Sequence, residues 1–283
     1  MIKNRNISKK SLHIFNCFVI IYGYLNLLRE DFKMKKNFLK FTAMVAAMVL
    51  AVGALSACGS KKKVLTMATN AEFKPFEYLE GEEIVGADID MAKAIAEKLG
   101  YELEISNIDF DAALTGAATG KYDMAVAGIT ATDERRQNMN FSNDYFKASQ
   151  SIIVVADSEI KGKDDLEGKI IACPEGTTGE QYLLDEGYEI QSFKTAPEAV
   201  SALKAGKADA VIVDNAVAKA LSAEQNGATV VLDEALTEEA YAIALKLGND
   251  ELTEKINGAL DEIKNDGTLA KIFEKYDLTY DAE

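Results

Sequence analysis

From Val64 onward, short β-rich runs alternate with stretches of helical periodicity, and this alternation limits the fold more than any other feature of the sequence. Residues 64–68 form the first β-rich run. Apolar side chains then recur at helical spacing over residues 90–99, and Gly100 stands where a helix C-cap is expected. A chain that repeats this pattern is predicted to fold as α/β with mainly parallel sheets.

The alternation continues as two similar series that no long linker separates. The first series predicts strands at residues 101–105 and 124–127 and a helix at 111–119. The second series starts after Tyr145 and predicts strands at 151–156, 169–173 and 210–213, and helices at 196–205 and 215–225. The chain then predicts a long helix ending near Gly267 and a shorter one at 269–276.

Two series of this kind predict two lobes with a cleft between them. We expect residues 64–148 and 242–283 to form lobe 1 and residues 149–241 to form lobe 2, with crossings near 148–150 and 241–243. Ligands of open α/β sheets bind beyond the carboxyl ends of the strands. The sequence therefore predicts a ligand site in the cleft.

The segment before the alternation has the composition of a targeting sequence. Met34, Lys35 and Lys36 open a basic stretch, and an uncharged apolar run follows from residue 41 to residue 55. Leu55-Ser56-Ala57-Cys58 then resembles the lipobox of bacterial lipoproteins, which implies a signal peptide at 34–57, lipid on Cys58 and a tether at 58–63. The alternative is that Cys58 is an ordinary small residue ending a signal peptide that is cut elsewhere.

Residues 1–33 precede this complete signal and contain a second apolar stretch at 15–28. We interpret them as an upstream extension that is not part of the mature protein, with Met34 as the true initiator. An extra membrane segment is the alternative. With the signal peptide at 34–57 and lipid on Cys58, we expect the protein to be extracytoplasmic and anchored to the cell membrane by its lipid.

The charge of the remaining chain argues against nucleic-acid binding. Residues 1–57 hold nine of the 31 basic residues and two of the 46 acidic ones, which leaves 22 basic against 44 acidic residues. A surface with this balance repels phosphate backbones.

The scarcity of histidine and cysteine excludes several kinds of catalytic and metal site. The one histidine, His13, lies in the extension, and Cys173 is the one cysteine after Cys58. Ser-His-Asp and Cys-His catalysis and the usual zinc sites need more such residues than the mature chain has. We therefore expect no catalytic residues, no metal and no cofactor.

Six segments spread over residues 64–283 carry a resemblance to a known family. They are residues 68–78, 86–90, 127–135, 141–146, 176–180 and 208–214. With them the chain resembles the type 3 solute-binding proteins of polar amino-acid ABC importers. The resemblance implies the two-lobed periplasmic-binding-protein fold of type II and a monomer that binds a free L-amino acid by hinge closure. It also implies an ABC importer permease as partner.

The resemblance assigns the ends of the amino acid to particular residues. An amino acid needs a bidentate cation for its carboxylate and acceptors for its ammonium group. Arg135, at the start of a helix capped by Thr132, fits the carboxylate. The implied ammonium acceptors are Asp214, the carbonyl of Gly128 and the hydroxyl of Thr130, and Ala127 belongs to the same turn.

Each of these assignments has a simpler alternative. Arg135 could be a surface arginine paired with Asp133 or Glu134, as we interpret Arg136. Thr177 and Thr178 could close on the carboxylate from lobe 2, or one of them could only cap a helix. Asp214 could be a helix N-cap, a role compatible with ligand binding.

The remaining candidates concern the side chain of the ligand. Phe73 and Phe110 resemble the aromatic pair that flanks it, although either could be a core residue. Asn70 stands where relatives that bind basic amino acids or glutamine often carry an acid. Asn70, Glu72 and Glu175 could hold a polar or cationic tail, so we expect a polar, possibly cationic, amino acid.

Two other classes of function remain open. Some relatives on this fold are enzymes, and a dehydratase-like activity on a small carboxylate would need a general acid such as Glu72 or Glu175. A sensory amino-acid-binding domain is the other alternative. It normally continues into a membrane helix and a signalling module, which we do not expect after Glu283.

Overall fold

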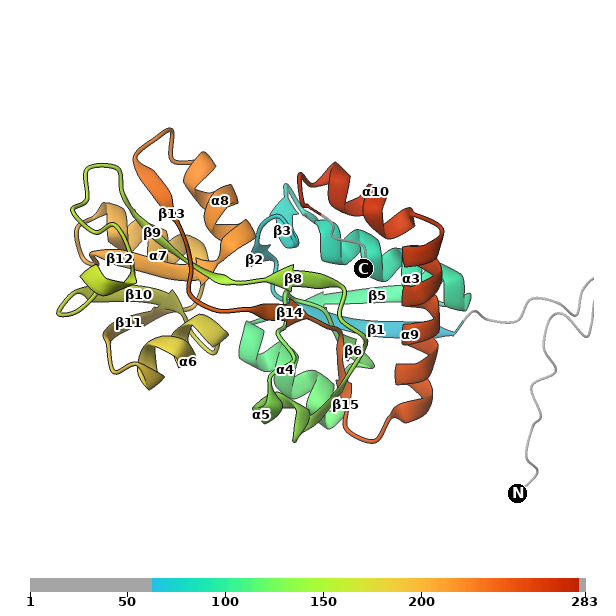
Figure 1. The fold of residues 1–283 in the computed structure, drawn as a ribbon. Helices are drawn as coiled ribbons and strands as arrows, with labels where there is room; N and C mark the ends of the chain where they lie inside the picture. The colour runs from blue at the N-terminus through green and yellow to red at the C-terminus, as the bar shows by residue number, and fades with distance from the viewer. Residues whose placement is uncertain (1–62, 280–283) are drawn as a thin grey trace, which may run out of the picture. The chain divides into compact units, whose positions relative to one another are not determined.

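A computed structural model describes residues 63–279, which fold around two five-stranded sheets (Figure 1). We call the parts built on them the first and the second lobe. The predicted extension, signal peptide, tether and lipidated Cys58 lie outside the described residues, apart from Lys63.

The first sheet has the order β5-β1-β6-β15-β7. Its strands are β5 (Glu102–Asn107), β1 (Val64–Thr69), β6 (Met124–Ala125), β15 (Ala244–Lys246) and β7 (Met139–Phe141). β1 pairs in parallel with β5 and β6, whereas β15 is antiparallel to both of its neighbours. Four strands thus run one way and β15 runs the other way.

The second sheet repeats this layout in the order β11-β10-β12-β9-β13. Its strands are β11 (Glu189–Phe193), β10 (Ile170–Pro174), β12 (Ala210–Asp214), β9 (Gln150–Val155) and β13 (Thr229–Ala235). Here β9 is antiparallel to both neighbours and occupies the fourth position, as β15 does in the first sheet. The prediction of two lobes with mainly parallel sheets is confirmed.

Two short paired strands connect the lobes. β8 (Phe146–Ala148) leads into β9, and β14 (Glu239–Tyr241) leads back to β15. They pair antiparallel, so the two crossings run side by side between the sheets (Figure 1). The exact lobe boundaries at 148/149 and 241/242 stay a prediction.

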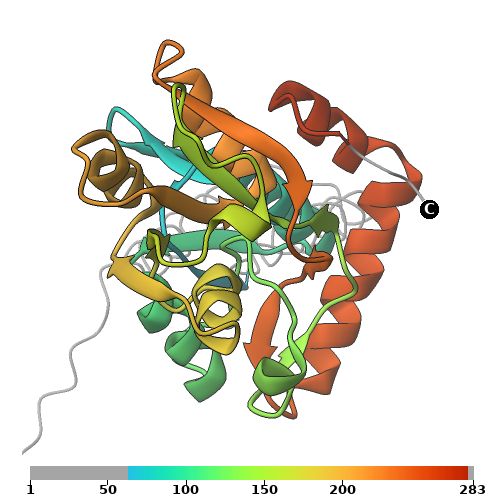
Figure 2. The same cartoon turned by 60° about the vertical axis from the view of Figure 1, so that its left-hand side comes forward.

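Helices cover each sheet, as Figures 1 and 2 show. The first lobe carries α3 (Ala87–Leu99), α4 (Phe110–Thr119), α5 (Asp133–Arg136), α9 (Asp250–Asn265) and α10 (Thr268–Lys275). The second carries η1 (Lys163–Asp165), α6 (Thr178–Asp185), α7 (Ala196–Lys204) and α8 (Asn215–Ala223). The predicted helices are all present, with ends that differ by up to three residues.

α3 shows why one helix begins earlier than its apolar pattern predicts. Gly100 ends it in the left-handed conformation, as expected. At the other end Gly86 has φ 133°, and a Cβ there would lie 2.0 Å from the carbonyl oxygen of Phe76. This close approach starts the helix at Ala87 and buries Asp88 beside the segment that contains Glu77.

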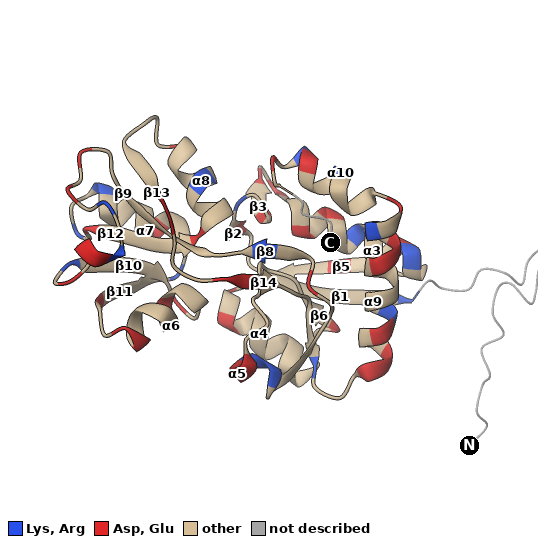
Figure 3. Cartoon of the chain, viewed as in Figure 1, with Lys and Arg blue, Asp and Glu red and all other residues tan. Residues whose placement is uncertain are grey.

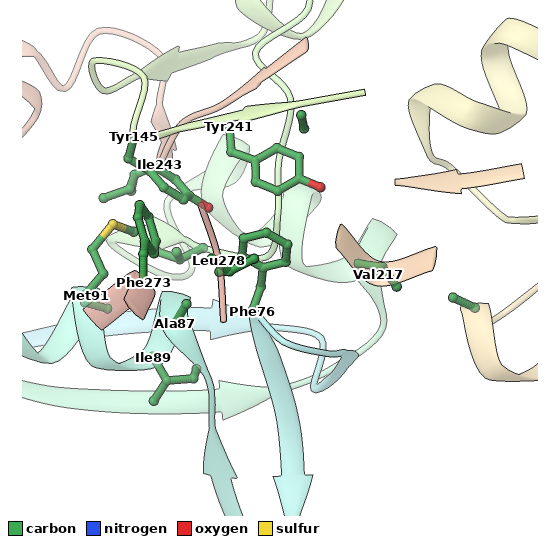
Figure 4. Close-up of a cluster of buried hydrophobic side chains, with 14 of the residues drawn as sticks. Phe76, Ala87, Ile89, Met91, Tyr145, Val217, Tyr241, Ile243, Phe273 and Leu278 are labelled. Atoms are coloured by element: carbon green, nitrogen blue, oxygen red, sulfur yellow. The ribbon is translucent and has the colours of Figure 1, made fainter. Parts of the chain in front are cut away.

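A small sheet of β2 (Glu72–Phe73), β3 (Glu77–Glu80) and β4 (Glu83–Val85) was not predicted from the sequence. It lies beside an aromatic core at the base of the crossings (Figure 4). There the rings of Phe76 and Tyr241 are 5.1 Å apart and nearly perpendicular. Both side chains are fully buried, so β3 and the crossing strand β14 are held to the same core.

Candidate functional site

The ten candidate ligand-binding residues line one cavity between the lobes. They are Asn70, Phe73, Phe110, Ala127, Gly128, Thr130, Arg135, Thr177, Thr178 and Asp214. Seven further residues line the cavity, and among them only Glu72 and Glu175 were named from the sequence, as options for holding the side chain of a ligand. The seven are Glu72, Glu77, Pro174, Glu175, Lys194, Thr195 and Ala196.

The topology explains how residues so distant in sequence meet. Asn70 follows β1, Ala127 follows β6, Glu175 follows β10 and Asp214 ends β12. These parallel strands have their carboxyl ends on the cavity side, as expected for open α/β sheets. The Asn70 amide donates to the carbonyl of Ile108 at 3.1 Å, which ties the loop after β1 to the loop before α4.

Arg135 lies across the gap between the lobes. Its Nη1 donates to the carbonyl of Thr130 at 2.9 Å, and its Nη2 donates to the carbonyl of Gly176 in the second lobe at 3.0 Å. Thr132 caps the first turn of α5 by accepting from the Arg135 amide, as predicted. Burial lowers the pKa of the guanidinium from its ordinary value, while Glu239 is the carboxylate that opposes this shift most.

The interpretation of Arg136 as a surface residue agrees with its position. It is exposed, and its Nε donates to the carbonyl of Ala131 at 3.1 Å. Arg136 does not line the cavity that contains Arg135.

The two phenylalanines stand on the wall formed by the first lobe. Phe110 lies below Arg135, with the guanidinium carbon 5.5 Å from the ring centre. Phe73 packs so closely on Gly128 that a Cβ at this glycine would be 2.7 Å from the ring. Both rings are partly exposed rather than buried in the core. Both rings thus line the cavity rather than the interior of the first lobe.

A carboxylate from the crossing strand connects two of the candidate threonines. Glu239 Oε2 accepts from the hydroxyl of Thr130 in the first lobe at 2.6 Å and from that of Thr178 in the second at 2.8 Å. Its Oε1 accepts from the Thr237 hydroxyl at 2.7 Å. The sequence reasoning missed Glu239, since nothing in the local pattern distinguishes it from its neighbour Glu238.

Thr177 has the capping role that was its alternative interpretation. Its hydroxyl accepts from the amide of Glu180 at 3.2 Å and donates to the carbonyl of Pro174 at 2.8 Å. The hydroxyl proton is therefore already used. The amides at the start of α6 remain as donors that could meet a carboxylate from the second lobe.

The floor of the cavity is acidic and buried. Asp214 is 4% exposed and accepts from the Tyr241 hydroxyl at 2.5 Å; its side chain makes no capping bond to α8. Burial, together with the Glu239 carboxylate, raises the pKa of Asp214 to about 7.

Glu77 lines the same cavity and is fully buried. No neighbouring group donates a hydrogen bond to either of its carboxyl oxygens. Burial and the nearby Asp88 raise its pKa well above the ordinary value. Asp88 accepts from the Gly128 amide at 3.0 Å and the Tyr145 hydroxyl at 2.7 Å, and burial raises its pKa to about 6.

Glu175 and Glu72, which the sequence suggested as partners for a cationic ligand side chain, are less favourably placed for that role than Glu77. Glu175 forms an ion pair with Lys194 at 2.5 Å, which neutralises it. Glu72 lines the cavity but is exposed. Glu77 was missed because it lies among charged residues in a surface-like segment, and its burial depends on packing between β3 and α3.

Within residues 63–279, no cluster of three or more histidine, cysteine, aspartate or glutamate side chains has an arrangement that could hold a metal ion. Over the same residues, every helix is too short or too polar to cross a bilayer. Cys173 is buried in β10 and, within the described chain, forms no disulfide.

Comparisons with known proteins show which family the chain is similar to. The family model for bacterial extracellular solute-binding proteins, family 3, matches residues 65–279. The arginine-binding extracellular protein ArtP of Bacillus subtilis is 34% identical over 235 residues, which cover 79% of this chain and 92% of that protein.

Two solved structures have a similar fold. An ancestral arginine-binding protein, solved with arginine and with glutamine, is 41% identical with a TM-score of 0.72, covering 77% of this chain and 99% of that one. The arginine-, lysine-, histidine-binding protein ArtJ of Geobacillus stearothermophilus is 35% identical with a TM-score of 0.72, covering 76% and 95%.

Proposed function

Because the chain belongs to the bacterial extracellular solute-binding proteins of family 3, we propose that its cavity binds a free cationic L-amino acid, with arginine or lysine as the class. In this proposal the protein delivers the amino acid to an ABC importer permease and catalyses no reaction. Lipid on Cys58 would hold it to the outer face of the cell membrane.

One observation carries the choice of a cationic ligand, namely the buried carboxyl group of Glu77 in the cavity wall, whose side-chain partner is another acid, Asp88. Ionising two adjacent buried carboxyl groups is costly, and a ligand cation would offset that cost. Phe73 and Phe110 would flank the aliphatic part of the same side chain. Relatives named for binding arginine support this choice.

The α-carboxylate and α-ammonium groups would bind at Arg135 and Asp214 in the same cavity. Arg135 uses two of its N–H donors on the carbonyls of Thr130 and Gly176, which leaves three for a ligand carboxylate. Asp214 would accept from the ammonium group. Because the donors and acceptors come from both lobes, the ligand would favour the closed arrangement that an importer recognises.

The proposal is tested by a thermal-shift screen of the common L-amino acids followed by calorimetry. L-arginine or L-lysine should raise the melting temperature most, because a ligand stabilises the state that it binds. Glu77→Gln should weaken binding of the cationic ligand about tenfold or more, and binding of L-glutamine by less than about threefold.

Glu72→Gln is the matched control, since Glu72 lines the same cavity but is exposed. It should change the affinity for either ligand by less than about threefold. A wild-type protein that responds to neutral amino acids and ignores the cationic ones would refute the cationic class. The mass of the mature N-terminal peptide tests separately whether Cys58 carries lipid.

A further inference from the structure

Glu239 accepts hydrogen bonds from the hydroxyls of Thr130 and Thr178, two residues of the cavity wall. It does not line the cavity itself, but it lines an outer groove together with Thr130, Arg135 and Thr178. It belongs to β14, whose pairing with β8 places Glu239 opposite Ala148, and it is the acidic residue of that strand, which starts in red in Figure 3. The two threonines therefore separate Glu239 from the ligand space.

The chemistry of these two hydrogen bonds is directional. A carboxylate oxygen only accepts, and a threonine hydroxyl has one proton to give. Because Glu239 Oε2 is 2.6 Å from Thr130 Oγ1 and 2.8 Å from Thr178 Oγ1, both hydroxyl protons point at Glu239. Neither hydroxyl keeps a proton for a ligand carboxylate.

The lone pairs of both hydroxyls remain. Thr130 keeps two, while Thr178 also accepts from the Gln150 amide at 3.2 Å and keeps one. Thr130, Thr178 and Asp214 all line the cavity, so the remaining lone pairs of the hydroxyls and the Asp214 carboxyl are acceptors for a donor bound there. The ammonium group of an amino acid is such a donor.

We propose that Glu239 is a positioning residue that turns the hydroxyls of Thr130 and Thr178 into acceptors for the α-ammonium group of the ligand. This deepens the proposed function and rests on it, because it presupposes that an amino acid binds in the cavity. It also changes the expected role of Thr178, whose hydroxyl then serves the ammonium group instead of the carboxylate.

The test compares an amino acid with its desamino analogue, which keeps the carboxylate and the side chain but lacks the α-amino group. Calorimetry gives the ratio of the two dissociation constants for L-arginine and its analogue, and for L-lysine and its analogue. In Glu239→Ala the preference for the amino acid should fall about 10-fold to 100-fold, because both acceptors lose their orientation.

Glu239→Gln should keep the preference within about threefold of wild type. The amide oxygen can still accept from Thr130 and Thr178 while the amide nitrogen donates to the Thr237 hydroxyl. Glu239→Met has a similar length without an acceptor oxygen, so it should resemble Glu239→Ala and serves if the alanine variant does not fold. Glu238→Ala, at the exposed neighbour, should leave the ratio unchanged.

Equal losses for the amino acid and its analogue in Glu239→Ala would overturn the proposal, because they indicate a purely structural role. A Gln variant as impaired as the Ala variant would also overturn it, since charge rather than hydrogen-bond direction would then matter. If wild type prefers another amino acid, that amino acid and its desamino analogue replace the arginine pair. If wild type binds no amino acid, the proposed function fails together with this inference.

Discussion

Two parts of the cavity wall, which we call the cationic end (Arg135) and the acidic end (Glu77 with Asp88), handle buried charge in opposite ways. At one end the guanidinium of Arg135 is already satisfied in part by carbonyls of Thr130 and Gly176, one from each lobe. At the acidic end Glu77 is fully buried beside Asp88, and these two carboxyl groups can bond to each other only by sharing a proton. The cationic end bridges the lobes, whereas the acidic end lies within the first lobe.

This difference indicates how the two ends would respond to a ligand. Arg135 can keep its lobe-bridging bonds and add a ligand carboxylate, so its contribution is orientation and charge. The acidic end can only be completed by a donor from outside, or by protons. The arrangement thus predicts that affinity depends mainly on Arg135 and that its dependence on pH arises mainly at the acidic end.

Removal of the guanidinium should have the largest effect on binding. Arg135→Ala would leave a ligand carboxylate buried without its cation, which costs about 3 to 5 kcal/mol, or roughly a hundredfold to several thousandfold in affinity. Calorimetry with the amino acid identified in the screen measures it.

Arg136→Ala is the control, because Arg136 is exposed and bonds to a carbonyl of its own turn. Its affinity should stay within about threefold of wild type. An Arg135→Ala protein that folds and binds as tightly as wild type would remove the cationic end from the comparison.

The buried acids, both at the acidic end and at Asp214, should give a smaller, pH-dependent effect. Burial raises the pKa of Asp88 to about 6 and that of Asp214 to about 7, and it raises the pKa of Glu77 well above the ordinary value. A folded protein with raised acid pKa values binds more protons than the unfolded chain. The ligand-free protein should therefore lose stability as the pH rises from about 4 through about 7.

Binding of a cationic amino acid should change in the opposite direction. Deprotonated acids attract the ligand cation, so the affinity for L-arginine should rise by about tenfold between about pH 5.5 and pH 8. Melting temperatures and calorimetry across this range measure both trends. Glu77→Gln should flatten the rise in affinity, and a rise of the same size in this variant would assign the titration to other groups.

The sequence predicted the residues that line the cavity more completely than it predicted which charged groups are buried in its wall. The alternation of strands and helices placed Asn70 and Gly128 after strands of the first sheet and Asp214 at the end of a strand of the second, and ligands of open α/β sheets bind beyond such carboxyl ends. The short segments from 72 to 85 and from 239 to 241 lacked such a pattern. Their pairing depends on tertiary contacts, which local periodicity does not encode.

The missed residues follow from this limit. Glu77 and Glu239 both lie in those segments, and they differ from the exposed Glu80 and Glu238, respectively, only by what packs against them. Glu77 is buried because the tight approach at Gly86 brings α3 onto the strand that carries it. A single sequence shows the residue type but not this approach, so the burial of Glu77 in the cavity wall could not be derived from it.

The smallest predicted effect concerns a solvent-exposed ion pair between the two lobes. Lys74, next to the small sheet of the first lobe, contacts Glu224 after α8 in the second lobe at 2.6 Å, and both side chains are more than 40% exposed. Exposed pairs contribute little because water and salt screen them. Lys74→Ala should therefore weaken binding by less than about threefold at low salt, and the difference should vanish near about 1 M salt. Measured against Arg135→Ala, it would show how much of the value of a charge between the lobes comes from burial. A loss approaching that of Arg135→Ala would mean that the rim pair, and not the cavity, holds the lobes together.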